Sequence, residues 1–598
     1  VIPNGITSTI YVNMAAHCRS LTMNSGGTAN TLSINAGQSL TVTNGITLGA
    51  GTGSGDNKTL SVNTGTLSAG WLTMTATGGS NRQTRLSVST GTVNIDGNIS
   101  MGANNYFNFS STGTLNIEGN IVGGTLNPST GTVNFRGSQS QVITGSGTSN
   151  FYNVTINKDA ASQTVTNSGN AITVGGSLTI NTGTFHLNAT DANSTISGNL
   201  VINPAGRLTH NVNWDLSGRL LSIEGNIDID GVFDYSVRSH VQMAGSGTKY
   251  VRTGSAAGSA FSILTLTTGN YLASGELNIN DNFWPMFSTS GSFRTNGNTV
   301  NANAALLTAG GTVYVDGGTL NVSGGLYTGT GVAGSLNISS GTLNTDFFNM
   351  GDGTVAGYVT QSGGTFNITG NVTINTSSVF TCSNSPAINV GGNWVSNNNG
   401  GFVPGSSVLT FNSTASDQYI QGSASTQSFS TINVNKTGRT LHVSGSATTL
   451  NISRLNINQG TFNAGTATTM NVSGNWMNNG SYTQASARVV FNGTALQTIS
   501  GSSLTTFHQV TVNNGAGINL SGIDAAISGA DIPEIIFFKN QAMAKFEDLL
   551  SLDYLDGISV SETTRFGKVY DGINQVAKKE NADFIVMGSH GASGFHEM

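Results

Sequence analysis

Residues 91–99 read GTVNIDGNI, and close copies follow as GTLNIEGNI at residues 113–121 and as GTVNF at residues 131–135. The phrase returns at Gly318, Gly341, Gly364 and Gly460. Within each group of neighbouring copies, successive starts are about 20 residues apart, which is the length of one turn of a solenoid. This period predicts one copy of the phrase per turn.

The alternation inside the phrase predicts a β-strand. Thr and Asn alternate with Leu, Val, Phe or Ile, so one face is polar and the other apolar, and the flanking glycines suit turns. So short a strand can bury its apolar face only by stacking on the next copy. The predicted fold class is therefore mainly β: a parallel β-helix (β-solenoid) of roughly 25 turns over residues 1–522, followed by a partial α/β doubly wound fragment.

The charged residues divide the chain into two parts. Residues 1–522 contain 16 Lys/Arg and 16 Asp/Glu, whereas residues 523–598 contain 6 and 12. Glycine accounts for 81 of the 598 residues and charged residues for only 8%, against about 25% charged residues in an average globular protein. We therefore predict two domains, at residues 1–522 and 523–598, and expect their junction to reflect gene assembly rather than an evolved fusion.

The same composition excludes several classes of function. A net charge of −6 over the chain offers no basic stripe that could neutralise phosphates, so we expect no nucleic-acid partner. No run of the sequence reaches the about 18 apolar residues that span a membrane. Cys18 and Cys382 are the only cysteines, and we interpret them as small core residues rather than as a disulfide framework or metal site.

The outward positions of the phrase carry Thr and Asn. Stacked identical side chains can form hydrogen-bonded ladders that stiffen a solenoid, and this is the interpretation we favour. The alternatives are a flat polar face that binds glycan and a regular threonine array presented to ice.

A longer repeat is superimposed on the short one. Trp394 and Trp476 lie 82 residues apart, and each leads into a matching block, at residues 408–422 and 489–501. The first half of the chain carries the same block at residues 133–145. The two tryptophans are candidate carbohydrate-binding residues, since an exposed ring can stack on a sugar whereas a buried ring belongs to the core.

These repeats resemble the Asn/Thr/Gly-rich, adhesin-like regions of large secreted surface proteins of Bacteroidetes, of the kind that the type IX system exports. The resemblance covers residues 1–520. It implies an extracellular or cell-surface protein whose partners are surface glycans or other surface proteins.

The densest group of carboxylates is a candidate calcium or carbohydrate site. Alternation in the sequence Ile-Asp-Ile-Asp places Asp228 and Asp230 on one outward face, which suits a hard cation or the acid pair of a polysaccharide-cleaving β-helix. A solvated strand face explains the pattern equally well. The whole group comprises Glu224, Asp228, Asp230 and Asp234, with Arg219 and Arg238 nearby.

After residue 522 the pattern changes to alternating helix and strand. Helical spacing over residues 539–552 and a buried strand at residues 584–587 predict a fragment of a doubly wound sheet. Residues 582–594, ADFIVMGSHGASG, resemble the universal stress protein family. Members of that family that bind ATP use Gly-x2-Gly-x9-Gly-Ser/Thr. Gly588 and Gly591 match its first half, but the second half would begin beyond Met598, so we expect no ATP binding.

The leading functional hypothesis is a secreted or surface-attached structural and adhesive solenoid that is not an enzyme and needs no cofactor. One alternative is a carbohydrate-binding or carbohydrate-cleaving β-helix protein, with Ca²⁺ as the cation that its acidic group would take. The other is a nucleotide-binding stress-protein fusion, and the C-terminal segment alone would indicate the cytoplasm.

Overall fold

A computed structural model describes the part of the chain that precedes residue 522. Within it the secondary structure consists of strands, from β1 (Ile10–Val12) to β55 (Ile518–Ser521), which pair in parallel. The described residues contain no helix, and hence none long and apolar enough to cross a membrane. The helices predicted after residue 522 lie outside them. The described residues are 1–521 without 4, 7, 76–81, 146–148, 170, 190–192, 211–219, 236–238, 281–286 and 304.

Each turn contains three strand segments, which confirms the predicted parallel β-helix. In one turn, β9 (Thr92–Ile95) leads into β10 (Ile99–Phe109), whose two ends pair with different partners, and β11 (Thr114–Ile117) opens the next turn. Three ladders result. Ladder A contains β9 and β11, ladder B contains the start of β10 from Ile99, and ladder C contains the end of β10.

Apolar side chains that alternate along each strand fill the interior. On ladder A, Leu67, Val93, Leu115, Val133 and Val154 lie directly over one another in five successive turns, and all five are buried. Burying each such side chain stabilises the fold by about 1.5–3 kcal/mol relative to leaving it exposed. The period-two pattern of the phrase therefore produces one continuous core.

The turns are longer than the short phrase suggests. Asn134 follows its ladder partner Asn116 by 18 residues, but Lys58 follows its partner Asn30 by 28 residues. The solenoid consequently has about 21 turns, and the prediction of 25 was too high. The bends between strands therefore differ in length from turn to turn.

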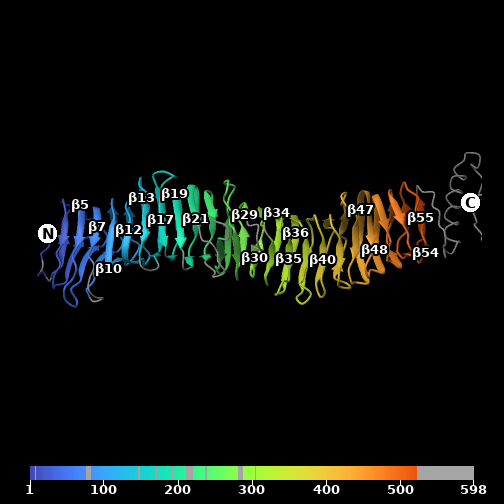
Figure 1. Cartoon of the computed structure of the whole chain (residues 1–598), viewed down its shortest axis with the longest axis horizontal. Helices are drawn as coiled ribbons and strands as arrows, with labels where there is room; N and C mark the ends of the chain where they lie inside the picture. The colour runs from blue at the N-terminus through green and yellow to red at the C-terminus, as the bar shows by residue number, and fades with distance from the viewer. Residues whose placement is uncertain are drawn as a thin grey trace, which may run out of the picture. The chain divides into compact units, whose positions relative to one another are not determined.

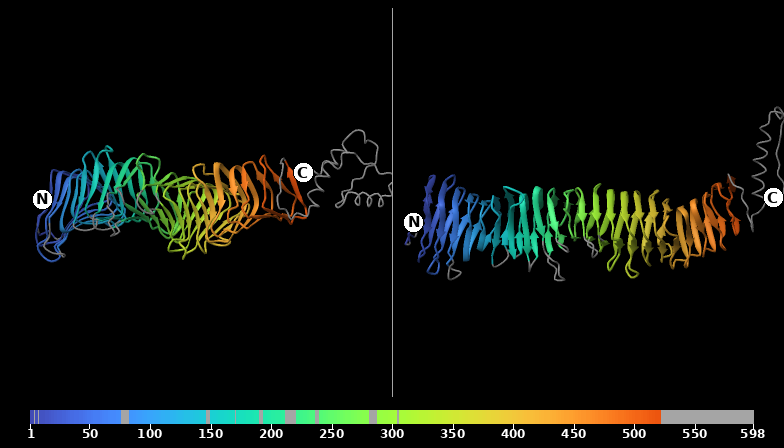
Figure 2. Two further views of the ribbon diagram at one scale, coloured as in Figure 1. Left: turned by 45° about the vertical axis from the view of Figure 1, so that its right-hand side comes forward. Right: turned by 45° about the horizontal axis from the view of Figure 1, so that its top comes forward.

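The chain divides into two compact units, Val1–Thr410 and Phe411–Met598. In the first unit, the strands of successive turns lie side by side (Figures 1 and 2). In the second, β47 (Thr426–Val443) and β48 (Thr449–Asn463) pair over three consecutive segments, so that each makes a whole turn. The domain boundary predicted at residue 522 coincides with the end of the described residues and stays a prediction.

A Gly-Asn pair forms one corner of many turns. A Cβ atom on Gly119 would lie only 2.2 Å from the carbonyl carbon of Gly97 in the preceding turn, so this corner requires glycine. The next residue binds across turns: Asn98 Oδ1 accepts a hydrogen bond of 2.8 Å from the Asn120 amide, and Asn120 Oδ1 accepts one of 2.7 Å from the Val142 amide.

The repeated phrase does not keep to one side of the solenoid. Its copies at Thr92, Thr114 and Thr132 form part of ladder A. In the second group, however, Thr312 of β34 (Thr312–Val322) continues ladder A, and the phrase copy that starts at Thr319 lies in ladder B. The same sequence thus occupies two different sides of the first unit.

Candidate functional site

Three members of the predicted acidic group, Asp228, Asp230 and Asp234, form ion pairs with arginines. Asp228, in β23 (Ile227–Ile229), lies opposite Arg252 of the next turn, and its carboxylate binds Nε of that guanidinium. Asp230 Oδ1 lies 2.7 Å from Nη1 of the same Arg252. One guanidinium therefore binds both carboxylates that were predicted to share an outward face, and this group of three keeps a net negative charge.

Asp234 belongs to a separate pair. It lies in β24 (Val232–Tyr235) on ladder B, and its Oδ2 atom is 2.7 Å from Nη1 of Arg207. Within the described part of the chain, no group of three or more His, Cys, Asp or Glu residues could hold a metal ion. Arg219 and Arg238, expected near this group, lie outside that part.

The two candidate tryptophans are core residues. Trp394 in β43 (Trp394–Ser396) and Trp476 in β50 (Trp476–Asn478) are both 0% exposed. The Trp394 ring packs edge-on against Phe402 with the ring centroids 4.8 Å apart, and Trp476 packs in the same way against Tyr482 at 4.8 Å. Neither ring has a face open for a sugar, so the burial favours the structural interpretation of the long repeat.

The glutamine of the long repeat accepts a hydrogen bond from a buried lysine, which was not among the residues predicted from the sequence. In the second unit, Lys436 Nζ donates to the carbonyl oxygens of Ser413 and Ser416 at 2.9 Å each and to Gln418 Oε1 at 2.8 Å. Burial lowers the pKa of Lys436 to about 8. The equivalent atoms in the first unit are Lys158 Nζ and Gln141 Oε1, 2.7 Å apart.

The third copy of this node replaces the lysine with an amide. Asn514 Nδ2 donates to Gln497 Oε1 at 2.9 Å. The node therefore cross-links neighbouring turns in each copy of the long repeat. The partners lie 17 or 18 residues apart, and this constant separation is the signal by which the sequence could have revealed them.

The outward asparagines of the phrase form the predicted hydrogen-bonded ladders. On ladder A, Asn116 Nδ2 donates to Asn94 Oδ1 at 2.8 Å, and Asn134 Nδ2 donates to Asn116 Oδ1 at 3.0 Å. A longer series on ladder B runs through six turns, with each amide donating to the one before it at 2.7–2.9 Å. Its members are Asn278, Asn301, Asn321, Asn344, Asn367 and Asn389.

Ladder A carries a different outward surface in the middle of the first unit, which we call the tyrosine strip. It consists of two neighbouring rows that cross six turns from β26 (Thr248–Arg252) to β38 (Gly357–Gln361). Three tyrosines stand on it, and polar side chains occupy most other positions. The first row is Tyr250, Leu272, Arg294, Tyr314, Asn337 and Thr360, and the second is Thr248, Asn270, Ser292, Thr312, Ser335 and Tyr358.

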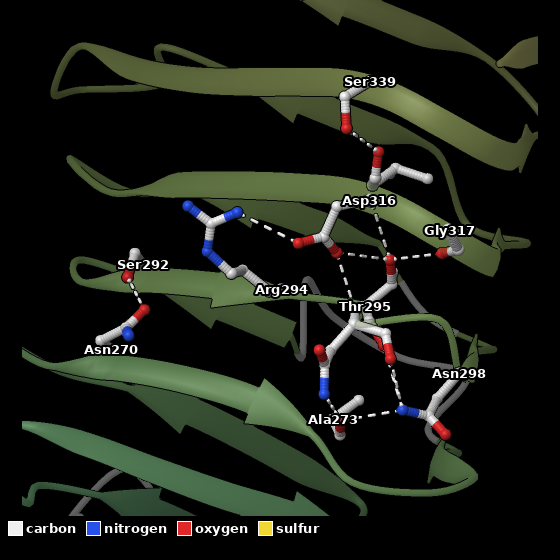
Figure 3. A network of polar contacts seen from close by, with 11 residues as sticks. Asn270, Ala273, Ser292, Arg294, Thr295, Asn298, Asp316, Gly317 and Ser339 are labelled. Atoms are coloured by element: carbon white, nitrogen blue, oxygen red, sulfur yellow. Dashed lines mark hydrogen bonds and ion pairs between the residues drawn. The ribbon is translucent and has the colours of Figure 1, made fainter. Parts of the chain in front are cut away.

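A polar network fixes the centre of the tyrosine strip (Figure 3). The Arg294 guanidinium carbon lies 3.8 Å from the centroid of the Tyr314 ring, and Nη1 of Arg294 is 3.0 Å from Asp316 Oδ2. Asp316 Oδ1 accepts hydrogen bonds from the Asn296 amide at 2.7 Å and from Thr295 Oγ1 at 3.2 Å. Arg294 is thus neutralised and held against an aromatic ring.

Gly588 and Gly591, the candidate nucleotide-binding residues, lie outside the described residues. The model of the universal stress protein family matches residues 524–598, which agrees with the resemblance seen in the sequence of the C-terminal segment. The match covers this segment alone. No curated protein and no solved structure matches the chain.

Proposed function

We propose that the chain is a secreted or cell-surface β-solenoid with a structural and adhesive role and with no catalytic activity of its own. The observation that carries this proposal is how the polar side chains are used. Amide ladders, Gly-Asn corners and buried Lys-Gln nodes join successive turns through distances of 2.6–3.0 Å. In the described residues these polar side chains join one turn to the next, which supports a structural role more than it supports catalysis.

The proposed location can be tested on intact cells of the source organism. Antibodies raised against the full chain should label unpermeabilised cells, because a surface protein is accessible from outside. Labelling that needs permeabilisation, and that follows a cytoplasmic marker, would contradict the proposal.

The proposed adhesion can be tested with the purified chain. Beads coated with it should attach to cells or extracellular matrix of the same community more strongly than beads coated with serum albumin. The low charge of the first 522 residues leads us to expect little loss of attachment between about 50 and 500 mM salt, because screening acts chiefly on charged contacts. Equal attachment by both kinds of bead would contradict an adhesive role.

The carbohydrate-cleaving alternative depends on Asp228 and Asp230. Both carboxylates bind the same Arg252 guanidinium. A glycoside hydrolase instead uses two carboxyl groups that face the substrate from either side of the bond that is cleaved. We expect the chain to release no reducing ends from a panel of plant and microbial polysaccharides. Release that disappears in both Asp228→Ala and Asp230→Ala would establish these residues as catalytic.

The family match at residues 524–598 favours one further candidate function, nucleotide binding. Its candidate residues are Gly588 and Gly591, which match the first half of the ATP-binding motif. Equilibrium dialysis of the full chain with labelled ATP tests this candidate. Saturable binding that is weakened by Gly588→Ala and Gly591→Ala would support it, and no saturable binding would remove it.

A further inference from the structure

We infer that the tyrosine strip binds an uncharged polysaccharide that lies along ladder A. This inference rests on the proposed adhesive function, for which it names the face of the solenoid and the class of ligand. It is carried by the exposed rings, by the polar groups between them and by the balance of charge on the strip.

Two of the three rings are widely exposed, whereas the Arg294 guanidinium covers one face of the third, Tyr314. Tyr250 is 45% exposed and Tyr358 is 47% exposed, although both belong to regular strands of the solenoid. A tyrosine ring offers an apolar face with a hydroxyl group at its edge, which matches a pyranose ring with its C–H face and peripheral hydroxyls. Because the backbone of each tyrosine is held in a ladder, a ligand would order little more than the side chain itself.

The spacing of the rings suits a chain rather than a single sugar. Tyr314 lies three turns beyond Tyr250 in the first row, and Tyr358 is displaced by two more turns into the second row. At about 4.8 Å per turn, the rings are spread over roughly 24 Å along the ladder. A ligand that contacts both Tyr250 and Tyr358 must therefore extend over several sugar units.

Leu272 and Arg294 lie between Tyr250 and Tyr314 in the first row, but hydroxyl and amide groups occupy most of the other positions beside the rings. Thr312 and Ser335 separate Ser292 from Tyr358 in the second row, and Asn337 and Thr360 follow Tyr314 in the first. Each of these side chains can both donate and accept hydrogen bonds, as sugar hydroxyls do. Polar groups of this kind orient a ligand whose main contact area comes from the rings.

The charge of the strip selects an uncharged ligand. Arg294 is the single charged side chain of the two rows, and the Asp316 carboxylate neutralises it at 3.0 Å. A uronate or sulfate group on a polysaccharide would therefore lose water without gaining a cationic partner, which is unfavourable. A neutral chain carries no such penalty.

Ladder B, on the neighbouring side of these turns, provides an example of polar side chains with a purely structural role. There the six asparagines of ladder B bind one another, and each internal amide gives its Nδ2 to the preceding residue and its Oδ1 to the following one. Those polar groups are used within the fold. The aromatic rings of the tyrosine strip have no equivalent along that series.

Affinity gel electrophoresis of the full chain tests the inference. The gels contain mixed-linkage β-glucan, xyloglucan, galactomannan or dextran as neutral probes and polygalacturonate as the anionic probe. We expect at least one neutral polysaccharide to retard the protein and polygalacturonate not to. The double variant Tyr250→Ala/Tyr358→Ala should bind the retarding polysaccharide about tenfold more weakly, which is about 1.4 kcal/mol, because two ring faces are removed.

Two further variants separate ring stacking from other effects. Tyr358→Phe keeps the ring and should retain binding within about twofold. Tyr11→Ala removes a ring that is 58% exposed on β1, in ladder C, and should leave binding unchanged. Circular dichroism of each variant verifies that the solenoid is intact.

The inference is overturned if no neutral polysaccharide retards the protein, if polygalacturonate retards it more strongly, or if the double variant and Tyr11→Ala bind equally well. The bead assay distinguishes these failures from failure of the proposed function. Beads that attach equally well with wild-type and double-variant protein would leave adhesion standing and remove the tyrosine strip from it.

Discussion

Lys436 shows how a single residue links the stability of the second unit to pH. Its ammonium group donates three hydrogen bonds and so uses all of its protons. Burial lowers its pKa from the usual 10.5 to about 8. Between these two values the unfolded chain holds a proton that the folded chain has lost, so this residue makes the folded state more stable as the pH rises.

We predict that Lys436→Met removes this pH dependence. Between pH 8 and 10.5 the wild-type free energy of unfolding should rise relative to that of the variant, by at most about 1.4 kcal/mol per pH unit. The variant should be less stable overall at pH 7, because the hydrogen bonds to the Ser413 and Ser416 carbonyl oxygens and to Gln418 Oε1 are lost. Urea unfolding at several pH values measures both effects, with Lys249→Met as the control. Parallel pH profiles for wild type and Lys436→Met would contradict the prediction.

Asn344 sits inside the six-residue asparagine series of ladder B. It donates to Asn321 and accepts from Asn367, both at 2.8 Å. We predict that Asn344→Ala lowers the free energy of unfolding by about 1–3 kcal/mol, since two hydrogen bonds are lost. Asn344→Asp keeps the acceptor for Asn367 but turns a charged acceptor towards Asn321 Oδ1, so it should lose at least as much stability as Asn344→Ala. Thr342→Ala, on the same strand and face, serves as the control, and an equal loss there would argue against the ladder as the cause.

At the scale of the strand, the sequence predicted the local structure because each phrase carries the alternating polar and apolar pattern of a β-strand. Alternation of Thr and Asn with apolar residues predicted the strands, the inward core and the outward amide ladders. The bends between strands could not be predicted in the same way. Ladder partners lie between 18 residues and 28 residues apart, so neither the number of turns nor the side on which a phrase would lie could be deduced.

The same variation in the spacing of ladder partners prevented prediction of the contacts at the candidate sites. Arg252 faces Asp228 only because 24 residues separate them, a spacing that one sequence does not single out from its neighbours. The tyrosine strip escaped notice for a related reason. Tyr250 and Tyr358 occur in strands whose sequences differ from the phrase, and Tyr314 precedes a copy of the phrase in β34. Only the pairing of these strands brings the three tyrosines to one side.

The corner glycines allow a prediction about the bend itself. Gly119→Ala would place a methyl group 2.2 Å from the carbonyl carbon of Gly97, so the two turns must separate. We expect a loss of stability of at least about 1–3 kcal/mol, typical of overpacking. Gly27→Ala is the matched control, because its nearest atoms would lie at 3.6 Å. Thermal unfolding followed by circular dichroism compares the two, and equal melting temperatures would contradict the argument.

At the scale of the whole molecule, the chain is an array in which each turn contacts chiefly its neighbours. Stability in such arrays is nearly a sum of local terms, and long arrays do not unfold in one step. The first unit contains Trp394 and the second Trp476, both buried. Each indole therefore reports on the unit that surrounds it.

We predict that the two units unfold at different urea concentrations. Trp476→Phe should remove the fluorescence transition of the second unit, whose sequence contains no other tryptophan, whereas Trp394→Phe should keep both transitions, because Trp71, Trp214 and Trp284 remain in the sequence of the first unit. Circular dichroism of both variants should show a broad, multistep loss of β-structure. The buffer and urea series are the same for both variants. A single transition, shared by both probes and by circular dichroism, would show instead that the solenoid unfolds as one cooperative body.

The passage of the repeated phrase from ladder A to ladder B has a consequence for how such a gene can change. If the three sides accept the same sequence, the unit of duplication or deletion in the gene need not be a whole turn. Gaining or losing one strand with its bend would rotate all later sequence by one side and leave the core intact. Recombination could thereby bring a stretch such as the tyrosine strip to a new direction while the protein still folds.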